Sequence, residues 1–193
     1  VVSSKSAFAT YSGSTNSTQF NGNSDDNTYV GLMYGNISAT NYASAHANIN
    51  KSTILTNLET WYKNNLASYE SKLADTIWCN DKSTFTTFRN GSTYGTGLGY
   101  GTNRTGYGAY NRIYGGDTSV YANPSMICPN DNNGGKLSKF TVGDTINGNG
   151  NLTYKVGLLT ADEAAFAGFV NGKSNYSTYL QEILSERKIQ YSK

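Results

Sequence analysis

The chain has 193 residues, of which 37% are hydrophobic and only 15% are charged, and its formal net charge is +2. A chain of this length can bury one sizeable core, so we expect a single domain over residues 1–193. Because it contains neither a basic run nor an apolar run long enough to cross a bilayer, the sequence predicts no nucleic-acid binding and no membrane insertion. Its 16 Tyr and 21 Gly, with many Asn, Ser and Thr, are typical of exported proteins.

Residues 1–27 alternate only weakly in hydrophobicity and end in a polar cluster, which predicts an N-terminal extension or an edge strand followed by a turn. The first residues look like the start of a chain from which an export signal or anchor has been removed. Residues 28–35, TYVGLMYG, contain a short apolar run bounded by Asn27 and Gly35, and such a run is typical of a central strand.

Residues 52–75 carry the clearest periodic pattern of the chain. Apolar and aromatic side chains such as Ile54, Leu58 and Tyr62 recur at steps of three and four, with polar residues between them. This spacing predicts one long α-helix with a buried face, and Ser52 can cap its first free N–H groups.

Gly and Tyr dominate residues 84–116, for which the sequence predicts a long surface loop that returns in a short strand at 110–114. Short strands are also expected at 140–142 and 152–159, with a turn at 145–150 between them.

Thr160 and Glu163 have the spacing of a capping box at the start of a short helix, and a further helix is expected at 177–188. The predicted fold class is therefore α+β, with one long helix at about 52–75 packed on a mixed, mainly antiparallel sheet.

The two cysteines, Cys79 and Cys128, have neither the spacing of a redox motif nor enough partners for a zinc site. In an exported protein such a pair most simply forms one disulfide, and two reduced, buried thiols are the alternative.

Three segments resemble an uncharacterised group of exported proteins from gut Firmicutes. They are the YVGLMYG run at 29–35, the Trp61–Tyr62 pair with the CNDKS turn at 79–83, and GLLTADE at 157–163. The resemblance extends over roughly residues 28–168 and supports the disulfide between Cys79 and Cys128. It also implies a fold like that of C-type lectins or of the formylglycine-generating enzyme. The closing WTLSP and GVRP segments of that group are absent from this chain.

Few residues suggest catalysis or metal binding. His46 is the only histidine and lies in a polar segment, so no catalytic triad is indicated. Asp81 and Glu163 could act as the carboxylate pair of a glycosidase, although Glu163 already has a capping role. The clusters at 25–27 and 131–133, and also Asp144, could offer oxygen ligands to Ca²⁺, but they lack the spacing of a calcium loop and read as turns. We therefore predict no metal and no cofactor.

The tyrosines of the Gly-rich region are better candidates, because a tyrosine on a polar loop offers flat apolar area and a hydroxyl at low entropic cost. The alternatives are that the tyrosines cover the core and that the polar pair after Cys79 only fixes a turn. The candidate ligand-binding residues are Tyr94, Tyr100, Tyr107, Tyr110, Asn80 and Asp81, with Tyr114 nearby.

We expect a non-catalytic domain of a gut bacterium, extracellular or on the cell surface, that adheres to or binds a glycan or another surface ligand. Two alternatives stay open at this point, a pilin-like or pseudopilin-like structural ectodomain and a glycan or cell-wall hydrolase.

Overall fold

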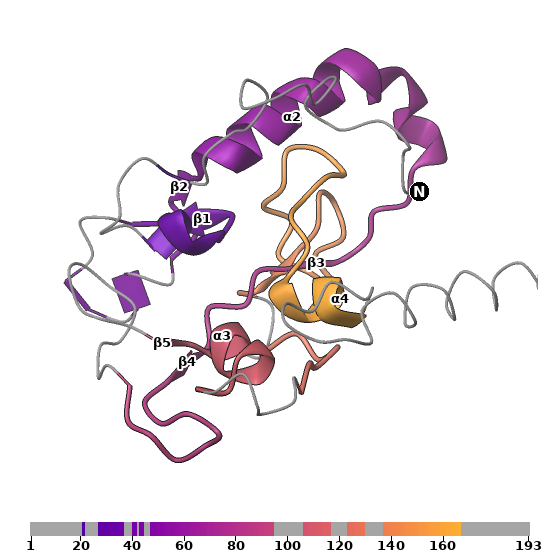
Figure 1. Cartoon of the computed structure of the whole chain (residues 1–193). Coiled ribbons are helices and arrows are strands. Elements are labelled where there is room, and N and C mark those ends of the chain that lie inside the picture. Colours follow the sequence, from indigo (N-terminus) through magenta and orange to yellow (C-terminus); the bar gives the residue numbers. More distant parts are fainter. Residues whose placement is uncertain are drawn as a thin grey trace, which may run out of the picture.

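A computed structural model describes residues 21, 27–36, 40–41, 43–44, 47–94, 106–116, 123–129 and 137–166. The helix expected at 177–188 and nearly all of the expected N-terminal extension lie outside these residues. The described chain combines helices with short antiparallel strands, so the predicted α+β class is confirmed at this level (Figure 1).

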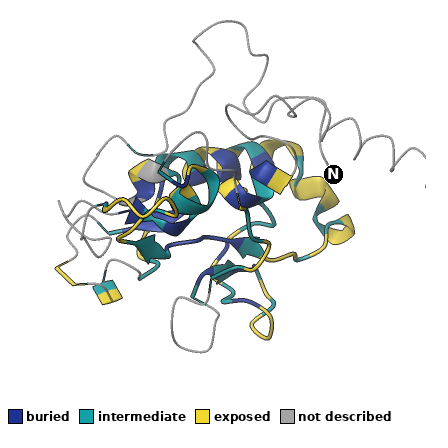
Figure 2. Ribbon diagram, turned by 60° about the horizontal axis from the view of Figure 1, so that its bottom comes forward, coloured by how far each residue is buried: buried dark blue, intermediate teal, exposed yellow. Residues whose placement is uncertain are grey.

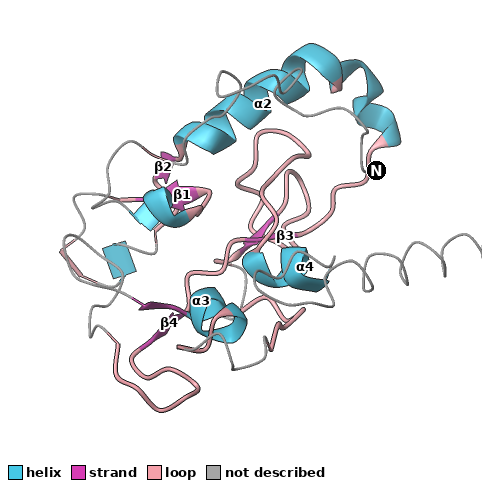
Figure 3. Ribbon diagram, viewed as in Figure 1, coloured by secondary structure: helices cyan, strands magenta, loops and turns pink. Residues whose placement is uncertain are grey.

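Within the described residues the strands form three antiparallel pairs, separated by long irregular stretches of chain (Figure 3). The continuous sheet expected from the sequence is not formed in the described part. The pairs are β1 (Tyr34–Gly35) with β2 (Asn50–Lys51), β3 (Trp78–Cys79) with β6 (Lys139–Phe140), and β4 (Thr84–Phe85) with β5 (Gly106–Tyr107).

Helix α2 (Thr53–Asn65) begins where the sequence predicts, because the Ser52 hydroxyl accepts a hydrogen bond from the Leu55 N–H at 3.3 Å. The expected extension to residue 75 is wrong. The α-helix ends at Asn65 and is followed by a 3₁₀-helix, η3 (Ala67–Lys72), none of whose residues is buried (Figure 2). Without a packed face, nothing favours continuation of the α-helix, because most helical stability comes from tertiary packing.

The core lies between α2 and the short strands, where buried residues gather in Figure 2. The rings of Tyr34 and Phe140 stack at 5.0 Å between centroids and join β1 to β6. The core residues are Met33, Tyr34, Leu55, Phe140 and Leu152, with Trp78, Val142 and Leu158 packed against them.

Leu32, Met33 and Tyr34 of the apolar run at 28–35 are buried, whereas Tyr29 is exposed, and only the last two residues of the run form a strand. It starts with a 3₁₀-helix, η2 (Asn27–Val30), and turns at Gly31, whose φ of 96° interrupts an extended conformation. The Met33 N–H then donates to the side chain of Asn80 at 2.8 Å instead of joining a strand.

Residues 152–159, expected to be a strand, have no regular structure. The Leu152 N–H donates to the Thr141 carbonyl at 3.0 Å, and Lys155 Nζ donates to the carbonyl oxygens of Glu70 at 3.1 Å and Leu73 at 2.7 Å in the helical segment. The ring of Tyr154 also lies 5.4 Å from that of Tyr62. A segment held in this way needs no strand partner.

The capping box is confirmed at the start of α4 (Ala161–Phe166). The Thr160 N–H donates to Glu163 Oε2 at 2.8 Å, and the Glu163 N–H donates to Thr160 Oγ1 at 3.1 Å. Within the stretches that the structure describes, no helix has both the length and the apolar character needed to cross a bilayer.

Candidate functional site

The first half of the region expected to be a loop, after β4, is a β-hairpin. The Phe88 N–H donates to the Ser92 carbonyl at 2.8 Å, and the Tyr94 N–H donates to the Thr86 carbonyl at 2.7 Å. Gly91 occupies the turn with a φ of 87°. Residues 95–105, including Tyr100, lie outside the described residues.

The segment expected to be a strand at 110–114 is instead part of helix α3 (Gly108–Ile113), with Tyr114 as its C-cap. This difference matters for the tyrosines. Residues four apart lie one turn apart on a helix but about 13 Å apart along a strand. Tyr110 and Tyr114 consequently stack, with ring centroids 5.1 Å apart and planes inclined by 11°.

The hairpin and α3 together present five aromatic rings that contact one another, which we call the aromatic platform. Centroid distances between neighbouring rings range from 4.9 Å for Phe85 and Phe88 to 6.4 Å for Phe85 and Tyr110. Tyr110 is 45% exposed and Tyr114 is 36% exposed. The members of the platform are Phe85, Phe88, Tyr94, Tyr110 and Tyr114.

Two further contacts define the frame of the platform. The Arg89 N–H donates to Asn111 Oδ1 at 3.0 Å, and Arg89 Nε donates to the Asn111 carbonyl at 3.1 Å, so the hairpin tip is fixed to α3. Partial burial raises the pKa of the Tyr110 hydroxyl, and the nearby hydroxyls of Tyr114 and Tyr94 raise it further. The Tyr110 hydroxyl is therefore a neutral donor and acceptor at neutral pH.

The other candidate residues lie at a different place. Asn80, Asp81 and Tyr107 border a cavity of about 320 Å³, which also has Ala and Leu side chains in its wall. The structure therefore separates the predicted ligand-binding residues into two groups, with Tyr94 and Tyr110 in the aromatic platform and these three at the cavity.

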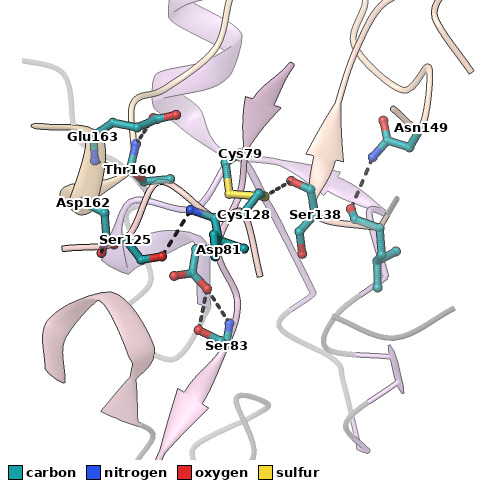
Figure 4. The surroundings of a disulfide bond; sticks show 12 residues. Cys79, Asp81, Ser83, Ser125, Cys128, Ser138, Asn149, Thr160, Asp162 and Glu163 are labelled. Carbon is teal, nitrogen blue, oxygen red and sulfur yellow. Dashed lines mark hydrogen bonds between the residues drawn. A yellow bond between two sulfur atoms is a disulfide. The ribbon is translucent and has the colours of Figure 1, made fainter. Parts of the chain in front are cut away.

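Asn80 and Asp81 have structural roles in this wall. Asn80 is 3% exposed and its Oδ1 accepts the Met33 N–H, while its Nδ2 has no hydrogen-bond partner within the described chain. Asp81 Oδ1 accepts two hydrogen bonds from Ser83, from the backbone N–H at 2.9 Å and from the side-chain hydroxyl at 2.6 Å (Figure 4). Fixing a turn, the alternative considered from the sequence, is thus what the Asp81 side chain does.

Arg112 joins Asp81 to Asp162 from α4. Its Nε and Nη2 donate to the two Asp162 oxygens at 2.6 and 2.8 Å, and Nη2 also donates to Asp81 Oδ2. The bonds to Asp162 chiefly raise the pKa of Arg112, burial opposes the shift, and Asp81 adds to it. This cluster was not predicted from the sequence, since Asp81 and Asp162 lie 31 and 50 residues from Arg112.

The disulfide between Cys79 and Cys128 is confirmed, with a Cα–Cα distance of 5.5 Å, and it lies beside this cluster (Figure 4). The Ser125 N–H donates to Asp162 Oδ1 at 2.8 Å. The covalent bond and the charged cluster therefore hold the same segment, 123–129, against the rest of the chain.

Comparisons with protein-family models, with curated proteins and with solved structures found no match.

The carboxylates considered for chemistry are already engaged. Asp81 is bound to Ser83 and Arg112, and Glu163 Oε2 accepts the Thr160 N–H. Asp144 Oδ1 accepts the N–H groups of Ile146 and Asn147, as expected for a turn. In the described ranges no three His, Cys, Asp or Glu side chains lie close enough together to hold a metal ion. Those ranges do not include His46, residues 25–26 or residues 131–133.

Proposed function

We propose that this chain is a non-catalytic, exported surface domain of a gut bacterium that binds a glycan through the aromatic platform. The observation that carries the proposal is the pair Tyr110 and Tyr114, which are stacked and 45% and 36% exposed. Such rings are large apolar surfaces with a polar edge, and they are common at sites that bind ligands.

The frame behind the pair favours binding. Phe85 and Phe88 support the tyrosines from the hairpin, and Arg89 fixes the hairpin to α3 through Asn111. Rings held in this way lose little freedom when a ligand binds, so less of the contact energy is offset by ordering. A sugar ring could lie with its C–H face on a tyrosine while its hydroxyls bond the tyrosine hydroxyls.

The proposal also includes the location of the chain and its overall arrangement. Disulfides persist in oxidising compartments, so Cys79–Cys128 supports an extracellular or cell-surface location. A lectin-like arrangement of the whole chain, implied by the resemblance to exported gut-Firmicutes proteins, stays a prediction. A hydrolase is disfavoured because the side chains of Asp81 and Glu163 are held by structural contacts.

The test is a glycan array with the full chain, followed by calorimetric titration of the strongest glycan. We expect Tyr114→Ala to weaken binding about 10-fold, because truncating a central aromatic contact typically costs more than about 1 kcal/mol. Tyr110→Ala, which removes the ring stacked against Tyr114, should do the same. Tyr69→Ala is the matched control, since Tyr69 is an exposed tyrosine on η3 outside the aromatic platform. If the wild type binds no glycan, or both platform variants bind like the control, the proposal fails.

A further inference from the structure

The cavity beside the disulfide is formed by four segments that are far apart in the sequence, at 31–32, 79–81, 107–109 and 158–164. Its volume of about 320 Å³ lies at the lower end of the range of about 300–1,000 Å³ for small-molecule sites. Helices α3 and α4, which lie side by side in Figure 1, each supply part of the wall.

The space exists because the helices present short side chains to it. Ala109 comes from α3, and Ala161 and Ala164 come from α4. Leu32 and Leu158 complete an apolar lining. The space is partly open to solvent, and most of its exposed wall is apolar, as is usual for a small-molecule site.

Two polar side chains of the wall, Asp81 and Thr160, are already engaged, whereas the buried Nδ2 of Asn80 has no hydrogen-bond partner within the described chain. Asp81 is bound to Ser83 and Arg112, and Thr160 Oγ1 accepts the Glu163 N–H. A charged ligand would lose its hydration on entering this apolar space. Asp81 could not compensate a cation, because it is already paired with Arg112. The lining therefore favours a ligand that is recognised by apolar contact.

We propose that this cavity is a second binding site, which takes an uncharged, mainly apolar small molecule of about the size of a substituted benzene ring. The site is independent of the aromatic platform and of glycan binding. It uses Tyr107 and the two helices, and none of the five platform residues borders it.

Benzyl alcohol is a suitable probe, because it is neutral, soluble and small enough to enter. Titration of the isotope-labelled full chain should give saturable amide shifts confined to Leu32, Ala109, Leu158 and Ala164, with a Kd on the order of 1 mM. Benzoate, its charged analogue, should bind at least about 10-fold more weakly.

Ala164→Phe should fill the cavity and abolish these shifts. Ala67→Phe is the matched control, because Ala67 is exposed on η3 and the same substitution there should leave the titration unchanged. A thermal melt shows whether each variant folds, and Ala109→Leu fills the cavity from α3 if Ala164→Phe does not fold.

The proposal is overturned if the wild type gives no saturable shifts, if a folded filled variant still gives them, or if benzoate binds equally well. Tyr114→Ala should bind the probe normally, which separates this site from the aromatic platform.

Discussion

Asp75 shows how one side chain can replace regular structure in this chain. Its carboxylate accepts three backbone N–H groups, from Val142, Gly143 and Asp144, each at 2.8 Å. Burial alone would raise the pKa of Asp75, but these three hydrogen bonds together lower it below its ordinary value of 3.8, against a small opposing effect of Asp144. The sequence marked Asp75 only as the end of a helix, since its partners are 67 to 69 residues away.

We expect Asp75→Asn to lower the free energy of unfolding at neutral pH by about 1–3 kcal/mol, because an amide cannot accept all three N–H groups. The contribution of a carboxylate with a lowered native pKa is complete above its unfolded pKa and is lost as pH falls through the native pKa. The difference between wild type and variant should therefore be full at about pH 7 and shrink below about pH 4.

Urea unfolding of the wild type and of Asp75→Asn, at about pH 7 and again below about pH 4, measures this difference in the free energy of unfolding. Thr76→Ala, at the exposed neighbouring position, is the control and should show no dependence on pH. A deficit in Asp75→Asn that stays the same in acid would mean that the carboxylate charge does not stabilise the turn.

At the scale of elements, the glycines around the aromatic platform make room for rings. A Cβ on Gly106 would lie 2.6 Å from the ring of Phe85, and one on Gly116 would lie 2.7 Å from Phe88. The sequence predicted a long surface loop here because glycine weakens the preference for regular structure. The structure shows glycine at places where an aromatic side chain packs directly on the backbone.

Gly106→Ala should therefore destabilise the chain by about 1–3 kcal/mol, the usual cost of overpacking, and should weaken the tyrosine signal in near-ultraviolet circular dichroism. Gly143→Ala is the matched control, because the nearest atom to its Cβ is 3.9 Å away, and it should change stability by less than about 0.5 kcal/mol. Equal effects of the two substitutions on both measurements would show that the rings do not need this space.

The elements predicted correctly are those determined by neighbours in the sequence. The Ser52 N-cap and the capping box of Thr160 and Glu163 require only residues three apart, and both are present. The strands expected at 110–114 and 152–159 failed because the partners of those segments, the platform rings and the carbonyls after α2, come from distant parts of the chain. Of the candidate site, the tyrosines could be proposed from the sequence, but their division between the aromatic platform and the cavity could not.

At the scale of the whole molecule, pairs of two-residue strands supply few ladder hydrogen bonds, so distant segments must be joined by other means. Arg112 joins the residues after β3 to α4, and the disulfide joins β3 to the segment 123–129. Both connections meet beside the cavity. We therefore expect the Cys79–Cys128 disulfide to contribute much of the free energy of unfolding.

The disulfide joins cysteines 49 residues apart, and closing a loop of this length stabilises a protein by roughly 4 kcal/mol in the chain-entropy model. A reducing agent should therefore lower the free energy of unfolding of the wild type by about that amount. The double variant Cys79→Ala, Cys128→Ala should already be destabilised and should not respond to the reductant, which controls for effects of the reagent itself.

Because Ser125 donates to Asp162 three residues before Cys128, the loss should also extend to the amides around Arg112, where hydrogen exchange should accelerate. Unchanged unfolding of the wild type under reduction would instead place the stability of this fold in the core under α2 and in the buried charges of Asp81 and Asp162.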